Sequence, residues 1–435
     1  MITYRIGVDK TYYYQSFIMK VLWITNILFP EAQKSLTGKG EMKGSGGWMT
    51  ASAECLANSE GISLVVATVS TSVDTLTVIQ GERIKYYVLP YGKGNKDYNP
   101  EYEPLFEYIH QTEKPDVVHI HGTEFTQGLA CVNACGNRNV VVSIQGLKSV
   151  IADYYCAGIT LKERLRNITL RDILKGGIVH EAKDFAKQGQ NEIALIRKVN
   201  HVIGRTAWDK AHTWVYNHDV IYHQCEETLR PEFYSSRKWA YSQCQKHSIF
   251  LSQAWYPLKG AHQVIKAAAI LVQLYPDLQI RIAGEDVTRF ANLRGLSHYT
   301  TYARYLSRLI RQYDLHAKVK FLGALSTQQM VDEYLNCNVF VCPSSIENSP
   351  NSLGEAQILG TPCIASYVGG IPDMMRGNEE NLFRFEEVEM LAEKISRVFS
   401  DGENQTDMSA SAAHRHDPLN NNRQLLSIYQ KIIGR

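Results

Sequence analysis

The sequence predicts an α/β protein built from two Rossmann-like domains that face each other across a cleft. The first reason is length, because 435 residues are too many for one ordinary hydrophobic core. The second is composition, since 44% hydrophobic and 21% charged residues are values typical of globular chains. The third is the pattern along the chain, in which short apolar runs alternate with helical stretches, as parallel sheets require.

The first eighteen residues differ from the rest. Residues 1–18 carry the cluster Tyr12, Tyr13 and Tyr14 without a clear period, whereas a strand-like run begins at Met19. We expect a leader upstream of a functional start at Met19, and a genuine extra segment is the alternative.

The two domains are expected over residues 19–235 and 236–418. Strand-like runs of the first domain are residues 21–25, 63–69, 85–89, 116–121, 140–144 and 201–204. Those of the second are residues 248–252, 279–283, 319–322, 338–342 and 363–366. Residues 231–246 are polar and indicate an interdomain linker, and residues 419–435 predict a terminal helix. Ligands bind beyond the carboxyl ends of parallel strands, so the site is expected in the cleft.

Bulk properties exclude several classes of protein. The net charge of +2 argues against a nucleic-acid partner. The chain contains no apolar run of membrane-spanning length and no secretory signal with a small-residue cleavage site. The nine cysteines are scattered, odd in number and without a Cys-x-x-Cys pair, which favours reduced thiols and a cytoplasmic location.

The stretch from Val339 to Ser366 is the most informative part of the chain. An apolar run predicts a buried strand, and a Ser/Pro/Asn-rich turn leads into a helix that opens near Asn351. Glu347 and Glu355 lie at this turn and in the first turns of the helix, with seven residues between them.

Amides at such a helix start favour anions, and nearby carboxylates hold sugar hydroxyls. The amides in question belong to Asn351, Ser352 and Leu353. A ligand with both phosphates and hydroxyls, such as a nucleotide sugar, suits this arrangement. The alternative is an acidic residue favoured by the helix dipole together with a solvated glutamate.

The pattern resembles the signature of retaining glycosyltransferases with the GT-B architecture, most closely the family-4 type (glycosyl transferases group 1). The resemblance implies that Glu355 holds the nucleotide ribose, that Glu347 contacts the sugar, and that the terminal helix crosses back onto the first domain. It also implies that the loop around Leu325 lies against the nucleobase. Gly369-Gly370-Ile371-Pro372-Asp373 is similar to the family's Gly-Gly-x-Pro-Glu element, with Asp in place of Glu.

Two motifs of the first domain fit the resemblance more loosely. A glycine-rich loop follows the first strand, and its Gly46 and Gly47 resemble the family's Gly-Gly element, whose amides approach the donor phosphate. A strand ending in His119 and His121 resembles the family's strand-end histidine near the donor sugar, with His121 the better match. A plain loop and a hydrogen-bonded core histidine are the alternatives.

Lys259-Gly260 matches the family's Lys-Gly element, which binds the donor diphosphate. The family's arginine six residues earlier is Gln253 here, which removes one cation from the expected site. We expect Arg205 to supply the missing charge, and an interdomain salt bridge is the alternative role for this residue.

The acceptor side is less defined by the sequence. Glu124 and Gln145 follow strands at the same end of the sheet and are candidates for contact with an acceptor, which we expect to be a glycan or a lipid-linked sugar. Apolar and basic positions mix at helical spacing between Leu161 and Lys175, a pattern that allows peripheral contact with an anionic membrane surface. A solvated amphipathic helix packed on the domain is the commoner outcome of such a pattern.

These features together predict a retaining hexosyltransferase that uses a UDP- or GDP-linked sugar as substrate, with a role in cell-surface polysaccharide synthesis. His121, Glu347 and Lys259 are its expected catalytic residues. The chain contains no Asp-x-Asp motif, so we expect no metal and no cofactor. The alternatives are a nucleotide-sugar epimerase of the same architecture and a catalytically weak sugar-nucleotide-binding protein.

Overall fold

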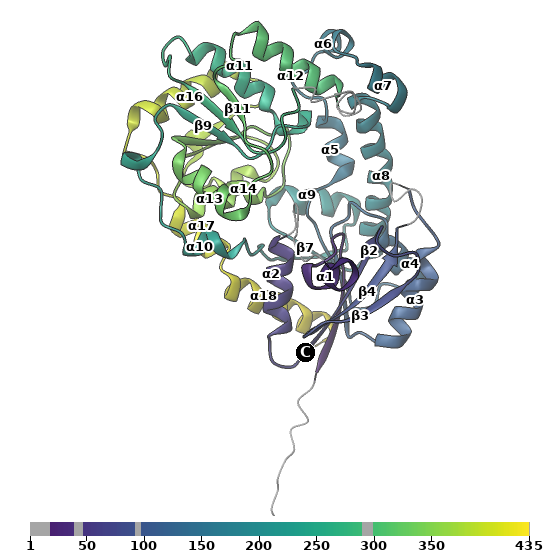
Figure 1. The fold of residues 1–435 in the computed structure, drawn as a ribbon. Coiled ribbons are helices and arrows are strands. Elements are labelled where there is room, and N and C mark those ends of the chain that lie inside the picture. The colour runs from purple at the N-terminus through teal and green to yellow at the C-terminus, as the bar shows by residue number, and fades with distance from the viewer. Residues whose placement is uncertain (1–17, 39–46, 92–96, 289–298, 435) are drawn as a thin grey trace, which may run out of the picture.

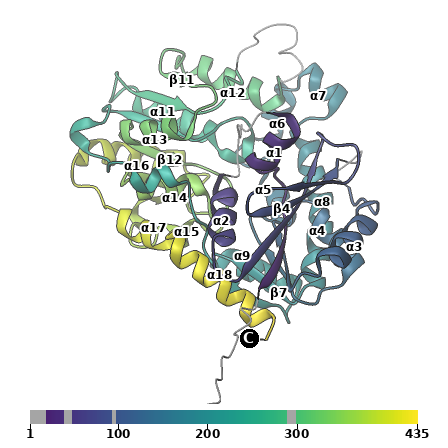
Figure 2. The same cartoon turned by 60° about the horizontal axis from the view of Figure 1, so that its bottom comes forward.

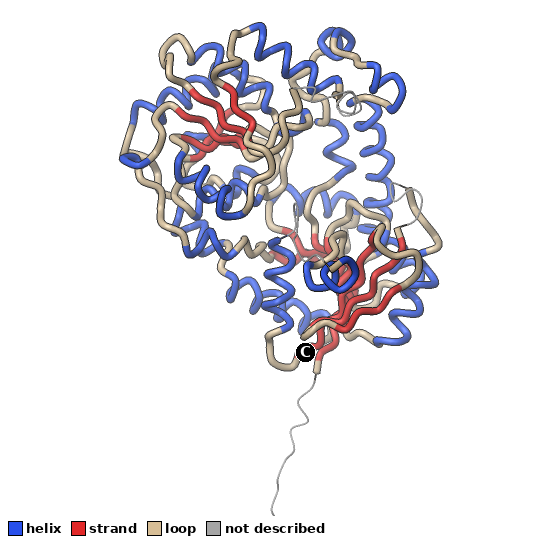
Figure 3. Tube along the Cα trace, viewed as in Figure 1, coloured by secondary structure: helices blue, strands red, loops and turns tan. Residues whose placement is uncertain are grey.

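A computed structural model describes residues 18–38, 47–91, 97–288 and 299–434. It confirms two Rossmann-like domains, each with its own central sheet (Figures 1 and 3). The predicted leader, residues 1–18, lies almost entirely outside the described residues. No helix in the described part of the chain is both long and apolar enough to cross a membrane.

The first sheet has eight strands in the order β3-β4-β2-β1-β5-β6-β7-β8, parallel except for the antiparallel pair β3–β4. Their bounds are β1 Met19–Ile24, β2 Ile62–Ser70, β3 Thr77–Gln80, β4 Ile84–Pro90, β5 Val117–His121, β6 Val140–Ser143, β7 His201–Gly204 and β8 Ile221–Gln224. The buried strands β1, β2, β4 and β5 are rich in Val, Ile and Leu, as expected for strands covered on both faces.

Helices cover both faces of this sheet. The helices of this part of the chain are α1 Pro30–Thr37, α2 Gly47–Ala57, α3 Tyr102–Glu113, α4 Gln127–Cys135, α5 Lys148–Tyr154, α6 Leu161–Arg166, α7 Leu170–Lys175, α8 Ile178–Lys198 and α9 Ala207–Tyr216, of which α6 and α7 lie beside α12 (Thr301–Gln312) of the second domain and not on the sheet. The segment from α5 to α8 reaches across to the second domain, because Tyr155, Ile159 and Ile178 belong to the core cluster of that domain.

The second sheet has six parallel strands in the order β11-β10-β9-β12-β13-β14. Their bounds are β9 Ser248–Leu251, β10 Gln279–Ile282, β11 Val319–Phe321, β12 Val339–Cys342, β13 Cys363–Ser366 and β14 Leu382–Phe383. The helices are α11 Ala261–Leu271, α12 Thr301–Gln312, α13 Thr327–Asn336, α14 Asn351–Ile358, α15 Ile371–Met374, α16 Val388–Asp401 and α17 Ser409–Arg415. The described residues of this domain also form the 3-10 helices η1 Tyr241–Gln243, η2 Pro257–Lys259 and η4 Glu379–Asn381.

The chain crosses between the domains twice, and the two crossings touch. Helix α10 (Pro231–Ser235) lies in the segment predicted as a linker, yet Phe233 and the preceding Leu229 are already buried in the core of the second domain. The Tyr234 hydroxyl donates a hydrogen bond to the carbonyl of His416 (2.6 Å), which lies where the chain returns to the first domain.

The terminal helix α18 (Pro418–Ile432) crosses back onto the first domain, as the resemblance implied, and runs beside α2 (Figure 2). Leu425, Ile428 and Ile432 pack into the core beneath β1. The indole N–H of Trp23 donates to the hydroxyl of Tyr429 (2.9 Å), so a buried polar contact also fixes this helix.

Candidate active site

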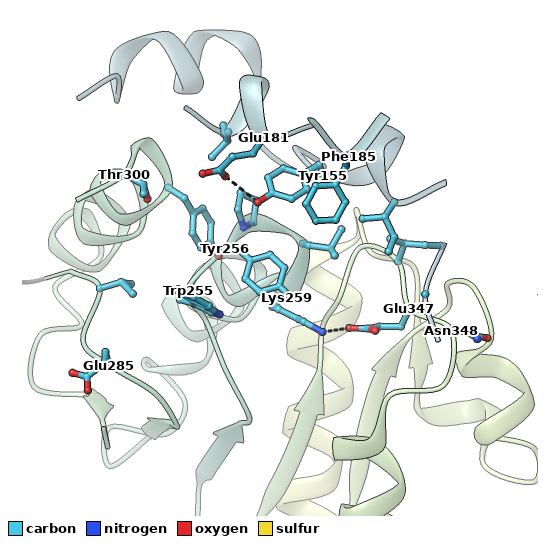
Figure 4. Close-up of a pocket in the computed structure, with 18 of the residues that line it drawn as sticks. Tyr155, Glu181, Phe185, Trp255, Tyr256, Lys259, Glu285, Thr300, Glu347 and Asn348 are labelled. Atoms are coloured by element: carbon cyan, nitrogen blue, oxygen red, sulfur yellow. Dashed lines mark hydrogen bonds and ion pairs between the residues drawn. The ribbon is translucent and has the colours of Figure 1, made fainter. Parts of the chain in front are cut away.

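A cavity of about 880 Å³ lies between the two domains (Figure 4). Helices α5 and α8 and the loop after β6 supply one wall, and the loops after β9, β10 and β12 supply the other. Aromatic side chains dominate the lining, which includes Tyr155, Phe185, Trp208, Trp255, Tyr256, Tyr299 and Tyr302. The cavity thus lies at the carboxyl ends of parallel strands, where α/β proteins bind ligands.

Lys259 and Glu347 form an ion pair on the wall of this cavity (Figure 4). Lys259 ends the 3-10 helix that follows β9, and Gly260 comes next with φ +67°. A Cβ at position 260 would lie 1.7 Å from the carbonyl oxygen of Pro343, so only glycine lets the two loops meet. Burial lowers the pKa of Lys259, but the charge and hydrogen bond of Glu347 together with Tyr256 and Cys342 outweigh burial, so the pKa rises and the ammonium stays protonated.

The position of Glu347 is fixed by its neighbours. Its carboxylate accepts a hydrogen bond from the hydroxyl of Ser344 (3.0 Å), and its carbonyl accepts one from the amide of Gly370 (3.0 Å). Gly369 has φ +54°, and a Cβ there would lie 1.9 Å from the Glu347 carbonyl. The Gly369-Gly370 element therefore holds the acidic turn in place by close backbone approach.

Asn348, beside Glu347, ties the two domains together. Its side chain accepts a hydrogen bond from Thr206 (2.6 Å) and donates to the carboxylate of Asp209 (2.9 Å) and the carbonyl of Gln145 (3.2 Å). Asp373 adds a second link by accepting from the amide of Ala207 (2.7 Å). Asn348 was not predicted from the sequence, because a single polar residue in a turn carries no visible periodicity.

Glu355 is buried and lies outside the lining of the large cavity. Its carboxylate pairs with Arg230 (2.7 Å from Nη2 and 2.9 Å from Nε) and lies 3.5 Å from the hydroxyl of Tyr334. Burial raises the pKa of Glu355 to about 7, and the Arg230 guanidinium offsets only part of that rise.

Arg230 was not predicted from the sequence, and it joins several elements of the donor side. Its side chain lies 3.4 Å from the position of a Cβ on Gly47, and its Nη1 donates to the hydroxyl of Thr327 (3.4 Å). Leu325 lies two residues before Thr327 and is partly buried against the core of the second domain. The Arg230 side chain thus pairs with Glu355 and lies beside Gly47 and the loop that contains Leu325. Gly46 lies outside the described residues.

The start of α14 carries three more predicted donor contacts. Asn351 has a buried Oδ1 without a hydrogen-bond partner within the described chain. Leu353 is fully buried in the core, and the carbonyl of Ser352 accepts from Tyr334 (3.0 Å). This places Asn351 and the first amides of the helix directly between the turn at Glu347 and the buried Glu355.

His119 and His121 lie on one face of β5, as strand alternation predicted, with ring centroids 3.8 Å apart. His119 is hydrogen-bonded to Tyr429 and to Ser143 (2.6 Å each), whereas Nε2 of His121 is buried without a partner in the described chain. Burial lowers the pKa of His121 to about 3, so its imidazole is neutral. It lines a small cavity next to Trp48 and not the large one.

The two acceptor candidates lie together. Gln145 lines the large cavity, and the carboxylate of Glu124 accepts from the amide of the next residue, Gly146 (3.1 Å). Burial raises the pKa of Glu124 to about 7.

The structure separates Arg205 from Lys259. Arg205 is buried in the first domain, pairs with Glu227 and donates to the carbonyl of Ile144 (2.8 Å). That Arg205 binds the donor diphosphate stays a prediction. To do so, its guanidinium would have to break the ion pair with Glu227. Gln253 lies half-buried in the loop after β9.

Several predicted site residues carry a buried polar atom without a partner. Of the ten such side-chain atoms among the described residues, five belong to His121, Glu124, Gln145, Arg205 and Asn351. His121 and Arg205 line the small cavity and Gln145 lines the large one, so these atoms do not form one cluster. An unpaired buried polar atom costs free energy, which a polar ligand would offset.

Comparison with known proteins agrees with this geometry. Residues 242–415 match the family model described as glycosyl transferases group 1. D-inositol 3-phosphate glycosyltransferase of Corynebacterium urealyticum is 27% identical over 179 residues, which are 40% of this chain and 41% of that protein. A GDP-mannose-dependent monoacylated alpha-(1-6)-phosphatidylinositol monomannoside mannosyltransferase of Corynebacterium glutamicum is 28% identical over 33% of this chain and 36% of its own length. The matched part spans about two fifths or less of these relatives.

Solved structures match over nearly the whole chain. Sucrose-phosphate synthase from Thermosynechococcus elongatus superposes with a TM-score of 0.70 at 17% identity, covering 95% of this chain and 99% of that one. HepE from Anabaena in complex with UDP-glucose gives a TM-score of 0.63 at 15% identity, with 95% and 100% covered. Residues 242–415 are thus similar to the glycosyl transferases group 1 family, and the two Rossmann-like domains have the GT-B fold of these solved structures.

Proposed function

We propose that this protein transfers a sugar from a nucleoside-diphosphate-sugar donor, UDP- or GDP-linked, to a hydroxyl of a glycan or lipid-linked acceptor. The observation that carries the proposal is the Lys259–Glu347 ion pair on the wall of the interdomain cavity. It offers an ammonium for a diphosphate and a carboxylate for sugar hydroxyls side by side.

The donor assignment draws support from both structure and relatives. Glu355 is about one turn along α14 from Asn351, whose Oδ1 has no partner among the described residues, and a nucleotide lying along this helix would bring its ribose to Glu355. HepE, which shares the fold, is known in complex with UDP-glucose, and one of the relatives above is named for GDP-mannose. These names support the class of donor for the present chain.

The proposed reaction proceeds with retention at the anomeric carbon. The bond between the sugar and the diphosphate breaks, and Lys259 together with amides at the start of α14 stabilises the charge that develops on the diphosphate. A diphosphate oxygen accepts the proton of the acceptor hydroxyl, whose oxygen bonds to the same face of the sugar. Glu347 orients the sugar hydroxyls, and the scheme needs no divalent metal. A role for the neutral His121 requires the sugar to reach the smaller cavity beside Trp48.

The acceptor is assigned to the aromatic part of the cavity. Trp255 and Tyr256 face Tyr155 and Phe185 across it (Figure 4), and such rings suit the apolar faces of sugar rings. Gln145 and Glu124 would bind acceptor hydroxyls at the end nearest the first sheet. The phosphatidylinositol mannoside named for one relative supports a lipid-linked acceptor and a role in cell-surface glycan synthesis.

A catalytically weak sugar-nucleotide-binding protein is the second candidate, because Gln253 replaces one expected cation and Arg205 is paired with Glu227. A panel of UDP- and GDP-sugars, scored by release of nucleoside diphosphate with and without acceptor sugars, tests both. Transfer predicts diphosphate release that rises with acceptor, and NMR of the product should show the anomeric configuration of the donor. Binding without release would favour the second candidate, and a changed sugar still bound to its nucleotide would indicate an epimerase.

A further inference from the structure

Two short helices at the outer end of the first domain present an unusual apolar surface. In α6 and α7, Leu161, Leu165, Leu170, Ile173 and Leu174 are each between 60% and 75% exposed. Ile168 between the helices and Val179 just after them are exposed as well. These seven residues are called the apolar tip, and Figure 1 shows α6 and α7 side by side at the edge of the molecule.

The helical spacing places the apolar side chains on continuous outer faces. Leu161 and Leu165 are four residues apart on α6, and Leu170, Ile173 and Leu174 are spaced three and four apart on α7. Soluble monomers rarely expose apolar patches of this kind without an interaction to cover them.

The acidic side chains of the same helices make contacts within the protein. Glu163 and Asp172 each complete a capping box with the preceding Thr160 and Thr169. Asp172 also accepts from Thr301 (2.5 Å) of the second domain, and Glu163 accepts from the hydroxyl of Tyr305 (3.2 Å). Polar contacts therefore hold α6 and α7 in place, and the leucines outside contribute little to that packing.

The charge left at the surface is basic. Lys162, Arg166 and Lys175 are exposed around the apolar tip. The two acidic residues of the same helices, Glu163 and Asp172, are engaged in the inward contacts described above. Leucines bordered by exposed lysine and arginine are the pattern that binds an anionic lipid surface.

We propose that the apolar tip docks on an anionic lipid membrane, with its leucines among the acyl chains and Lys162, Arg166 and Lys175 at the phosphate headgroups. A second copy of this chain is a poorer occupant, because two such tips would bring like charges together. The cavity lies close to this surface, since Arg171 and Ile178, from the same segment, line it. If the proposed transfer reaction is correct, a lipid-linked acceptor held by the membrane lies near the cavity.

Vesicle co-sedimentation of the full chain tests the proposal. We expect binding to phosphatidylcholine vesicles that contain phosphatidylglycerol, with much weaker binding to phosphatidylcholine alone and weakening by salt. The variant Leu170→Ser/Ile173→Ser/Leu174→Ser should lower vesicle partitioning by about 10-fold or more. Leu274→Ser/Leu419→Ser, which removes leucines of similar exposure elsewhere, is the matched control and should bind as wild type.

The charge variant Lys162→Glu/Arg166→Glu/Lys175→Glu should lose the preference for anionic vesicles. Wild-type partitioning of the triple-serine variant, or no vesicle binding by the wild type, would overturn the proposal. A wild-type dimer that the triple-serine variant converts to a monomer, without vesicle binding, would show self-association instead. Donor turnover with a soluble acceptor should be equal in wild type and triple-serine variant, so failure of membrane docking and failure of the transfer reaction are distinguishable.

Discussion

Replacement of Lys259 is the sharpest perturbation of the proposed site. The ammonium is one partner of a largely buried ion pair, in which both side chains are only 16% exposed. A hydrogen bond to a charged group contributes about 1.5–3 kcal/mol, so loss of the contact with the diphosphate should lower kcat/KM about 10- to 150-fold.

Stability must be separated from this effect. Lys259→Ala leaves Glu347 buried without its partner, and breaking a buried pair costs about 3–5 kcal/mol of folding free energy. The double variant Lys259→Met/Glu347→Gln removes both charges, so it should recover stability without recovering activity. Lys85→Ala breaks a Lys–Glu pair in the first domain and serves as a control that should lower stability without lowering kcat/KM.

The assay is release of nucleoside diphosphate under saturating acceptor, with Tm measured for each variant. We expect kcat/KM to fall in both Lys259 variants, whatever their Tm. A double variant with kcat/KM near wild type, or a loss of activity that follows Tm alone across all variants, would refute the role of Lys259 at the diphosphate.

Three further predictions concern pH, metal and acceptor. Because the pKa of Glu355 in the folded state is about 7, above its ordinary value, its contribution to stability is present at low pH and lost as pH rises through about 7. Donor kcat/KM should rise over the same range as the carboxylate ionises. Glu355→Gln should abolish this rise, and Arg230→Ala should move it to higher pH. Arg281→Ala, which breaks another ion pair of the second domain, is the control. An unchanged pH profile in both variants would contradict the role of Glu355 at the ribose. Transfer should persist in EDTA, and a loss that magnesium restores would refute the metal-free scheme. Trp255→Ala should raise the acceptor KM about 2- to 12-fold through lost ring packing. Trp214 is exposed to a similar degree but lies outside the cavity, so Trp214→Ala should leave the acceptor KM unchanged. Equal effects of the two substitutions would contradict an aromatic acceptor site.

Much of the fold was predictable because buried parallel strands leave a clear apolar signal. The strands the sequence failed to show are the weak ones: β3 and β8 are partly exposed, and β14 has only two residues. The boundary at residue 235 also lacked a signal, since a single buried Phe233 decides that α10 packs on the second domain.

The grouping of candidate residues was predictable where they are neighbours in sequence. Glu347, Asn351 and Glu355 share one turn and helix, and Lys259 pairs with Glu347 because β9 and β12 are neighbours in the sheet. The ion-pair partner of Glu355 was not predictable, because Arg230 lies 125 residues away in a segment without periodicity. Contacts of that kind depend on how distant segments pack together, which no short pattern encodes.

A crystal structure with bound UDP or GDP would decide whether the proposed donor site is correct. We expect a diphosphate within hydrogen-bond distance of Lys259 Nζ and a ribose hydroxyl on the carboxylate of Glu355. A nucleotide bound away from both residues, with the Lys259–Glu347 pair untouched, would contradict it.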